Sequence, residues 1–151
     1  MDQEKIFEYY KMAKKNFKMT NAFLEDVTVE KYQDIPVGGG VNEVSFGKRY
    51  DKIDDQYKGF LKTTILCRDN NTNEVVMKIE VVYSGVFEST GLGQAEMEEY
   101  VEAQIVPQLL SYARSIITHL TSLMSIPPIQ LPTMDVIQSL YNNQHVDNGD
   151  V

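Results

Sequence analysis

The side chains with the greatest catalytic potential are few and widely separated in this sequence. Its only histidines are His119 and His145, and its single cysteine is Cys67. A protein zinc site takes closely spaced cysteine and histidine ligands, and no such spacing is present. His119 lies among apolar residues with helical spacing, and Cys67 falls on an alternating pattern, where a cysteine packs as a small hydrophobe. The sequence therefore predicts no catalytic residue, no metal and no cofactor.

The densest acidic run consists of Glu96, Glu98, Glu99 and Glu102. Glu98 and Glu102 are one helical turn apart, a spacing that carboxylate metal ligands use, but no histidine accompanies them. Carboxylates near the N-terminus of a helix are stabilised by the helix dipole, which explains the run as solvated surface. Only this run and a hypothetical pairing of Cys67 with a histidine support one open alternative, a small α+β enzyme with an apolar-substrate pocket.

Phosphate ligands are disfavoured both by the motifs and by the charge distribution. The glycines Gly38, Gly39 and Gly40 are followed by Val41-Asn42-Glu43, without the lysine and hydroxyl residue of a phosphate-binding loop, so we interpret them as a flexible connection. Residues 1–78 hold 13 basic and 13 acidic groups, whereas residues 79–151 hold one basic group, Arg114, and nine acidic ones. Nucleic acids and anionic membranes need clustered lysine and arginine, so neither is an expected partner.

Several features favour a single cytoplasmic domain. No stretch approaches 18 consecutive apolar residues, and the start, Met1 to Lys5, lacks the basic and apolar regions of a secretory signal. A single cysteine fits a reducing compartment. The 42% hydrophobic content is sufficient for one core.

The spacing of apolar residues predicts the elements that position these side chains. Residues 4–16 have helical spacing, and residues 17–31 have the period of two of a half-buried strand. One face of this strand is expected to carry Met19, Phe23, Val27 and Val29, and the other Thr20, Leu24, Asp26, Thr28 and Glu30. Further strands are predicted at about 41–50, 57–68 and 74–87, and their single apolar faces are typical of an antiparallel sheet with one exposed side.

From Gln94 onward the spacing lengthens to about 3.6 residues, which predicts a long helix that Pro107 must kink or restart. The proline-rich residues 126–132 must be extended, and a short helix follows from about Thr133 to Tyr141. Residues 142–151 are polar and are expected to be disordered. Strands followed by helices give an α+β fold, with one domain over residues 1–141.

The second half resembles the SecB family of protein-export chaperones. The segment Pro107-Gln108-Leu109-Leu110-Ser111-Tyr112-Ala113-Arg114 is similar to the family's helix with a proline followed by Tyr-Ala-Arg. Pro128 and Pro132 have the spacing of the two prolines in its Pro-x-Leu-x-Pro link. Ser84 to Phe87 and Asp26 to Glu30 look like its Gly-Gly-Ile-Phe and Asp-Ile-Ser-Phe-Glu segments. The resemblance covers residues 17–141.

This resemblance implies an ATP-independent holdase, a chaperone that holds unfolded precursors in apolar grooves and hands them to the motor SecA. It implies a four-stranded antiparallel sheet, a long helix and a homotetramer built as a dimer of dimers. The SecA-docking acids match Asp26, Glu30 and Glu80. The client-binding groove matches Val44, Phe46, Met77, Val81, Tyr83 and Tyr112. Some SecB-like proteins serve toxin–antitoxin systems instead, so a chaperone dedicated to one partner, such as an antitoxin, is the alternative.

Overall fold

The computed structural model describes residues 3–4, 6–7, 16–36 and 40–131. The chain divides into two compact units, Met1–Ala113 and Arg114–Val151, and each is described by itself. The predicted short helix at 133–141, the predicted tail at 142–151 and the boundary between them lie outside the described residues, as do Gly38 and Gly39. Of the predicted helix at 4–16, Glu4, Ile6 and Phe7 are described and helical, whereas Asn16 has a φ of 53° and is in a turn.

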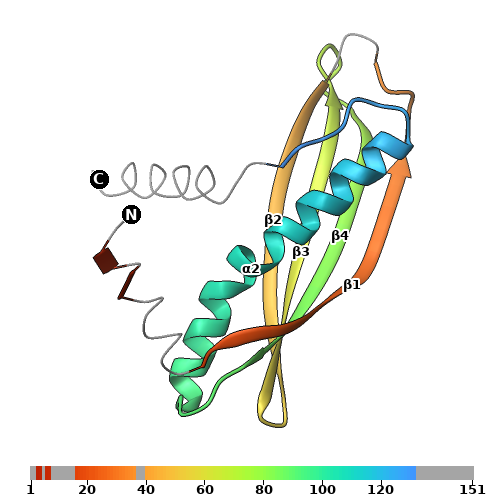
Figure 1. Ribbon diagram of the computed structural model, residues 1–151. Coiled ribbons are helices and arrows are strands. Elements are labelled where there is room, and N and C mark those ends of the chain that lie inside the picture. Colours follow the sequence, from red (N-terminus) through yellow and green to blue (C-terminus); the bar gives the residue numbers. More distant parts are fainter. Residues whose placement is uncertain (1–2, 5, 8–15, 37–39, 132–151) are drawn as a thin grey trace. The chain divides into compact units, whose positions relative to one another are not determined.

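The first unit is built on a four-stranded antiparallel sheet. Its strands are β1 (Lys18–Lys31), β2 (Gly40–Ile53), β3 (Gln56–Asp69) and β4 (Val75–Glu88), and the helix α2 (Gln94–Leu123) follows them. The order across the sheet is β1-β4-β3-β2, so β3 and β4 are inner strands and β1 and β2 are edge strands (Figure 1). The predicted α+β architecture of four strands followed by a long helix is confirmed.

The inner strand β3 alternates strictly between a buried and a partly exposed face, whereas β4 also buries Val76 and Ser84 and leaves Tyr83 half-buried. In β3 the buried side chains include Tyr57, Leu61, Thr63, Ile65 and Cys67, while the residues between them are partly or fully exposed. Their partners across β4 are on the same face because directly paired residues of an antiparallel sheet point to the same side. The two-residue turn at Asp54 and Asp55 joins β2 to β3, and Asp54 takes the positive φ (54°) that such tight hairpin turns require.

The edge strand β1 departs from the predicted alternation. Its pairing with β4 shifts between Met19 and Asn21 and again between Leu24 and Asp26. Each β-bulge inserts one residue and so reverses which face the following side chains occupy. As a result Phe23 pairs with Ser84 on the face of the sheet opposite the core, and Leu24 pairs with Tyr83 on the face that carries the core. The sequence-based assignment of these two side chains was wrong because a strict period of two cannot anticipate a bulge.

The helix α2 supplies the other half of the core of the first unit. Met97, Val101, Ile105 and Leu109 recur at every fourth residue, are at most 5% exposed, and form one cluster with Tyr57, Leu61 and Phe87 of the sheet. The helical assignment continues without a break through Pro107, so the proline does not restart the helix.

Two glycines allow this helix to approach the sheet closely. Gly59 of β3 and Gly85 of β4 are directly paired and buried. A Cβ atom on Gly59 would lie 2.7 Å from Ile105 Cγ1 and 3.0 Å from Phe87 Cε2. A Cβ atom on Gly85 would collide with the Met19 side chain. Gly59 therefore needs a residue without a side chain, whereas at Gly85 the contact is with the flexible Met19 side chain, which can shift.

In the second unit, the extended segment after α2 is tied to the end of the helix by hydrogen bonds. The Thr118 hydroxyl donates to the Ile129 carbonyl (3.1 Å), and the Ile129 amide donates to Thr121 Oγ1 (2.9 Å). Arg114 Nε donates to the Leu131 carbonyl (3.2 Å). Ile129 and Leu131 are buried. Residues 126–131 have no regular secondary structure, as their prolines predict.

Candidate functional site

The sheet of the first unit has an inner face, which carries the core, and an opposite face, here called the open face. The strand positions proposed for the groove are all on the inner face. The register pairs Val44 with Ile65, Phe46 with Thr63, Thr63 with Val81, and Tyr83 with Leu61, and Met77 pairs with the buried Cys67. The register of the strands therefore places these five groove positions on the inner face of the sheet.

Their exposure differs strongly. Met77 and Val81 are at most 1% exposed and contribute no surface in this conformation. Val44, Phe46 and Tyr83 are half-buried, and Tyr112 on α2 is 43% exposed. The rings of Tyr83 and Tyr112 are in contact, with centroids 5.6 Å apart. The accessible part of the proposed groove therefore consists of aromatic rings and one valine.

The inner face of β2 adds an aromatic residue that sequence reasoning missed. Tyr50 is half-buried, packs against the core cluster, and stacks edge-on against Tyr57 with centroids 5.9 Å apart. It continues the row of Val44 and Phe46 at a spacing of two or four residues. The period of two along β2 would have identified it, because residues of the same parity share a face. Lys48 interrupts the row and donates through Nζ to the Glu102 carbonyl of α2 (3.0 Å).

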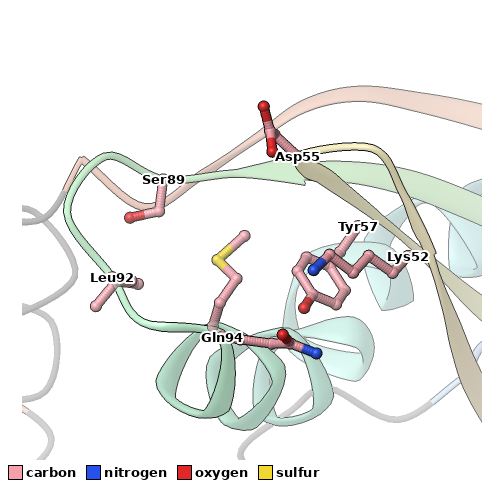
Figure 2. Close-up of a pocket in the computed structure, with 7 residues that line it drawn as sticks. Lys52, Asp55, Tyr57, Ser89, Leu92 and Gln94 are labelled. Atoms are coloured by element: carbon pink, nitrogen blue, oxygen red, sulfur yellow. The ribbon is translucent and has the colours of Figure 1, made fainter.

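A pocket of about 380 Å³ lies at the end of this row, between the β2–β3 turn and the start of α2. Figure 2 shows Tyr57 and Leu92 on opposite sides of it, with Asp55 and Gln94 at its rim. Among the described residues, its lining consists of Lys52, Asp55, Tyr57, Ser89, Leu92, Gln94 and Met97. The Tyr57 hydroxyl donates to Glu98 (3.2 Å). The pKa of Tyr57 is raised, mainly because the hydroxyl is buried and secondly because the negative charge of Glu98 is close to it. None of these seven described lining residues is a histidine or cysteine that would serve as a base or nucleophile.

The candidate docking acids are all on the open face. Asp26 pairs with Val82 and Glu30 with Lys78, while Glu80 pairs with Thr28 between them. Their environments differ. Asp26 and Glu30 are exposed and accept hydrogen bonds only from neutral hydroxyls, those of Thr28 and Tyr32, in the described structure.

Glu80 is instead enclosed by positive charge. Its carboxylate lies 3.0 Å from Lys78 Nζ and 3.6 Å from Lys62 Nζ, and only 22% of its side chain is exposed. The hydrogen bond from Lys78 is the main cause of its lowered pKa. The acidic character of this face therefore comes mainly from the two carboxylates of β1.

A second cluster on the open face arises from the β1 bulge. The Glu25 carboxylate forms an ion pair with Lys58 (2.8 Å) and accepts a hydrogen bond from the buried Ser84 hydroxyl (2.6 Å). The Lys58 ammonium lies between the rings of Phe23 and Phe60, at 5.9 and 5.3 Å from their centroids. Because the bulge turns Phe23 and Glu25 to this face, the alternation of the sequence could not reveal the cluster.

This cluster predicts a contribution to stability that acid removes. The hydrogen bonds from Lys58 and Ser84 lower the pKa of Glu25 from its usual 4.5. A carboxyl whose pKa is lower in the folded chain stabilises the fold above its unfolded pKa and loses that effect as pH falls through the folded pKa. Glu25→Gln should therefore lower stability at neutral pH and flatten the decline from about pH 6 to about pH 3 in urea-denaturation curves. Parallel curves for the two chains would contradict this role.

The described residues give little support to catalysis. Cys67 is buried, and burial raises the pKa of its thiol, so the nucleophilic thiolate is disfavoured. It lies ten residues along β3 from the pocket residue Tyr57, a separation of about 33 Å in an extended strand. Among the residues whose positions are described, no three His, Cys, Asp or Glu side chains form a metal-ligand group. Within that part of the chain no helix is long and apolar enough to span a membrane.

Comparison with known proteins agrees with the arrangement of the sheet and helix. The sequence model of the family described as preprotein translocase subunit SecB matches residues 11–148. The chain belongs to the SecB family. Among curated SecB proteins, the protein-export protein SecB of Dichelobacter nodosus is 24% identical over 106 residues, which are 68% of this chain and 67% of that protein. The SecB of Ruegeria is 22% identical over 128 residues, covering 81% and 77% of the two chains.

A solved structure supports the SecB fold independently. The SecB-like chaperone of Mycobacterium tuberculosis, solved in complex with a ChAD peptide from the HigA1 antitoxin, has a TM-score of 0.71 to this chain. The likeness covers 83% of this chain and 94% of that one, at 14% sequence identity. At this identity the likeness shows the SecB fold of the sheet and helix and nothing about partners.

Proposed function

We propose that this SecB-family chain is an ATP-independent holdase that binds extended apolar segments of unfolded proteins. The observation that carries the proposal is the row of half-buried apolar side chains on the inner face of β2, Val44, Phe46 and Tyr50. On the same side of the sheet, the exposed ring of Tyr112 on α2 contacts Tyr83 of β4. Covering such side chains with apolar client residues gains about 25 cal/mol per Å² removed from water. No cofactor or nucleotide is needed for this step.

The edge of β2 supplies a second source of affinity. Its register with β3 is unbroken from Gly40 to Ile53, unlike the bulged register of β1. The two-residue turn closes with a hydrogen-bonded pair, Ile53 and Gln56, and the bonding then alternates along an antiparallel ladder. The amides of Val44, Phe46, Lys48, Tyr50 and Lys52 therefore point to the free edge, and their side chains are on the inner face. An extended client pairing there would meet the backbone and the apolar row together.

This arrangement predicts an alternating pattern of amide exchange. In the free chain, the amides of Val44, Phe46 and Tyr50 should exchange quickly, whereas those of their neighbours Ser45 and Gly47 are already bonded to β3. Adding an excess of a 12-residue peptide of alternating valine and threonine should slow the outward amides at least about tenfold and leave the inward ones unchanged. Residue-resolved hydrogen exchange by NMR measures this, and a uniform change along β2 would exclude pairing at this edge.

The holding activity itself is tested by aggregation of a chemically unfolded protein on dilution. The chain should suppress light scattering at near-stoichiometric amounts without ATP.

We propose further that it works in the cytoplasm as a homotetramer, a dimer of dimers, and that it delivers preproteins to SecA through Asp26, Glu30 and Glu80. A solution mass of one subunit together with unchanged aggregation would contradict the holdase proposal.

A chaperone dedicated to one partner is the second candidate. The observation that favours it is the M. tuberculosis SecB-like protein, which was solved with an antitoxin peptide. Affinity purification from the source cells separates the two functions. One stoichiometric partner would support a dedicated chaperone, whereas a broad set of unfolded precursors would support general holding.

A further inference from the structure

The bulge in β1 places an exposed aromatic ring beside the candidate docking acids. Phe23 and Asp26 are three residues apart, so in a regular strand their side chains would point to opposite faces. The shift in register removes this difference. Phe23 pairs with Ser84 of β4, and Asp26 pairs with a residue two positions away on that strand, Val82. Both side chains therefore lie on the open face, where Phe23 is 46% exposed.

Phe23 is part of a small apolar strip on the open face. Phe60 of β3 also pairs with Ser84, so the two phenylalanines lie in one row with only a serine between them. Val82 lies on the same face in the next row. Phe60 and Val82 are half-buried. The strip therefore offers a partner apolar contact area that borders on the carboxylates of β1.

Negative charge extends from this strip along β1. In the described structure Asp26 and Glu30 accept hydrogen bonds only from neutral hydroxyls. Three lysines of the open face are paired with other acids: Lys58 with Glu25, and Lys62 and Lys78 with Glu80. A basic partner would therefore find its complementary charges along β1, next to the ring of Phe23.

We propose that the open face of β1 binds an extended, basic segment of a partner protein, with Phe23 as the apolar anchor. The inference depends on the proposed docking role of Asp26 and Glu30, which it deepens. Charge attraction alone positions a segment loosely and is screened by salt, whereas an apolar contact is not screened. The ring of Phe23 would therefore fix where along β1 the segment lies.

The register gives the spacing that such a segment needs. The partners of Phe23, Asp26 and Glu30 on β4 are residues 84, 82 and 78. Asp26 is therefore about 7 Å and Glu30 about 20 Å from Phe23 along the strand direction. An extended segment has the same rise per residue, and its alternate side chains face one surface. A large apolar side chain therefore matches basic side chains two and six residues away, counted in either chain direction.

Peptides test this spacing. The matched peptide is Ser-Phe-Ser-Lys-Ser-Thr-Ser-Lys-Ser, and its reversed sequence covers the opposite chain direction. A shifted peptide, Ser-Phe-Lys-Ser-Thr-Ser-Lys-Ser-Ser, and its reverse have the same composition but turn both lysines away from the face that carries the phenylalanine. At least one matched peptide should bind about fivefold more tightly than its shifted counterpart. Titration followed by amide chemical shifts in NMR gives the affinities and shows whether β1 is the strand contacted.

Variants test the anchor. Phe23→Thr keeps a residue that suits a strand and removes the ring, and it should weaken binding of the matched peptide about fivefold, by a similar factor at low and at high salt. Val41→Thr is the matched control. Val41 is 58% exposed on the same face but lies on β2, at the opposite edge of the sheet. This variant should bind the matched peptide within about twofold of the unchanged chain.

The outcomes distinguish this inference from the docking role on which it depends. Equal affinity for matched and shifted peptides, no binding of either matched peptide, or unchanged affinity in Phe23→Thr would each overturn the inference. If Phe23→Thr leaves peptide binding unchanged and lowers the solution mass, a second copy of the chain covers the ring instead. The docking role is judged separately with intact SecA, because Asp26→Lys combined with Glu30→Lys that still binds SecA would overturn it whatever the peptides do.

Discussion

A valine at Gly59 should destabilise the folded chain by about 3 kcal/mol or more, because even a Cβ atom there would lie 2.7 Å from Ile105 Cγ1 and 3.0 Å from Phe87. Both contacts belong to the core between the sheet and α2, so the helix would have to move away from β3. Urea denaturation followed by far-ultraviolet circular dichroism measures the loss. The accessible groove also depends on the close fit of helix and sheet, so peptide binding should fall with stability.

Gly47 provides the matched control. It lies on β2, and a Cβ atom there would have no heavy atom within 4 Å. Gly47→Val should leave stability unchanged or raise it slightly, because valine suits an extended strand better than glycine does. Equal losses in the two variants would show that the glycines matter for their backbone freedom and that close approach of α2 is not the reason for Gly59.

Reversing the two exposed carboxylates of β1, in Asp26→Lys combined with Glu30→Lys, should weaken binding to SecA about tenfold or more and leave aggregation suppression intact. Like charges brought together at an interface are strongly unfavourable. Glu80 is left in place because its carboxylate already compensates Lys62 and Lys78, and replacing it would change the sheet as well as the surface. Binding by surface plasmon resonance at two salt concentrations measures both the loss and its electrostatic origin.

A pair of substitutions elsewhere controls for net charge. Glu96→Lys combined with Glu99→Lys changes the total charge by the same amount at two exposed positions of α2. This variant should bind SecA almost as well as the unchanged chain. If both double variants lose affinity equally, the interaction depends on overall charge and the docking role of Asp26 and Glu30 is refuted.

The regular parts of the fold could be predicted from the sequence because their burial follows one period. The alternation in β3 and the spacing of four residues between Met97, Val101 and Ile105 describe faces that are buried throughout. The edge strand β1 could not be predicted in the same way. A bulge costs little at an edge, and its position depends on contacts such as Glu25 with Lys58 and Ser84, which are more than 30 residues away in sequence.

The site shows the same division. The family resemblance identified the groove positions Val44 and Phe46, and the period of two placed Glu80 on the open face. Neither could reveal that Lys62 and Lys78 surround Glu80, because that requires the register between β3 and β4. The exposed ring of Phe23 beside Asp26 was equally hidden, since only the bulge brings the two side chains to one face.

The buried thiol of Cys67 is an intrinsic probe of how often the folded chain opens. The sequence contains no other cysteine, and this one is 7% exposed on an inner strand. A thiol reagent can label the folded protein only when β3 is transiently uncovered, so the labelling rate reports the frequency of that event. Clients that bind against the inner face should lower the labelling rate of Cys67, and variants that loosen α2 should raise it. The measurement needs no probe added to the protein.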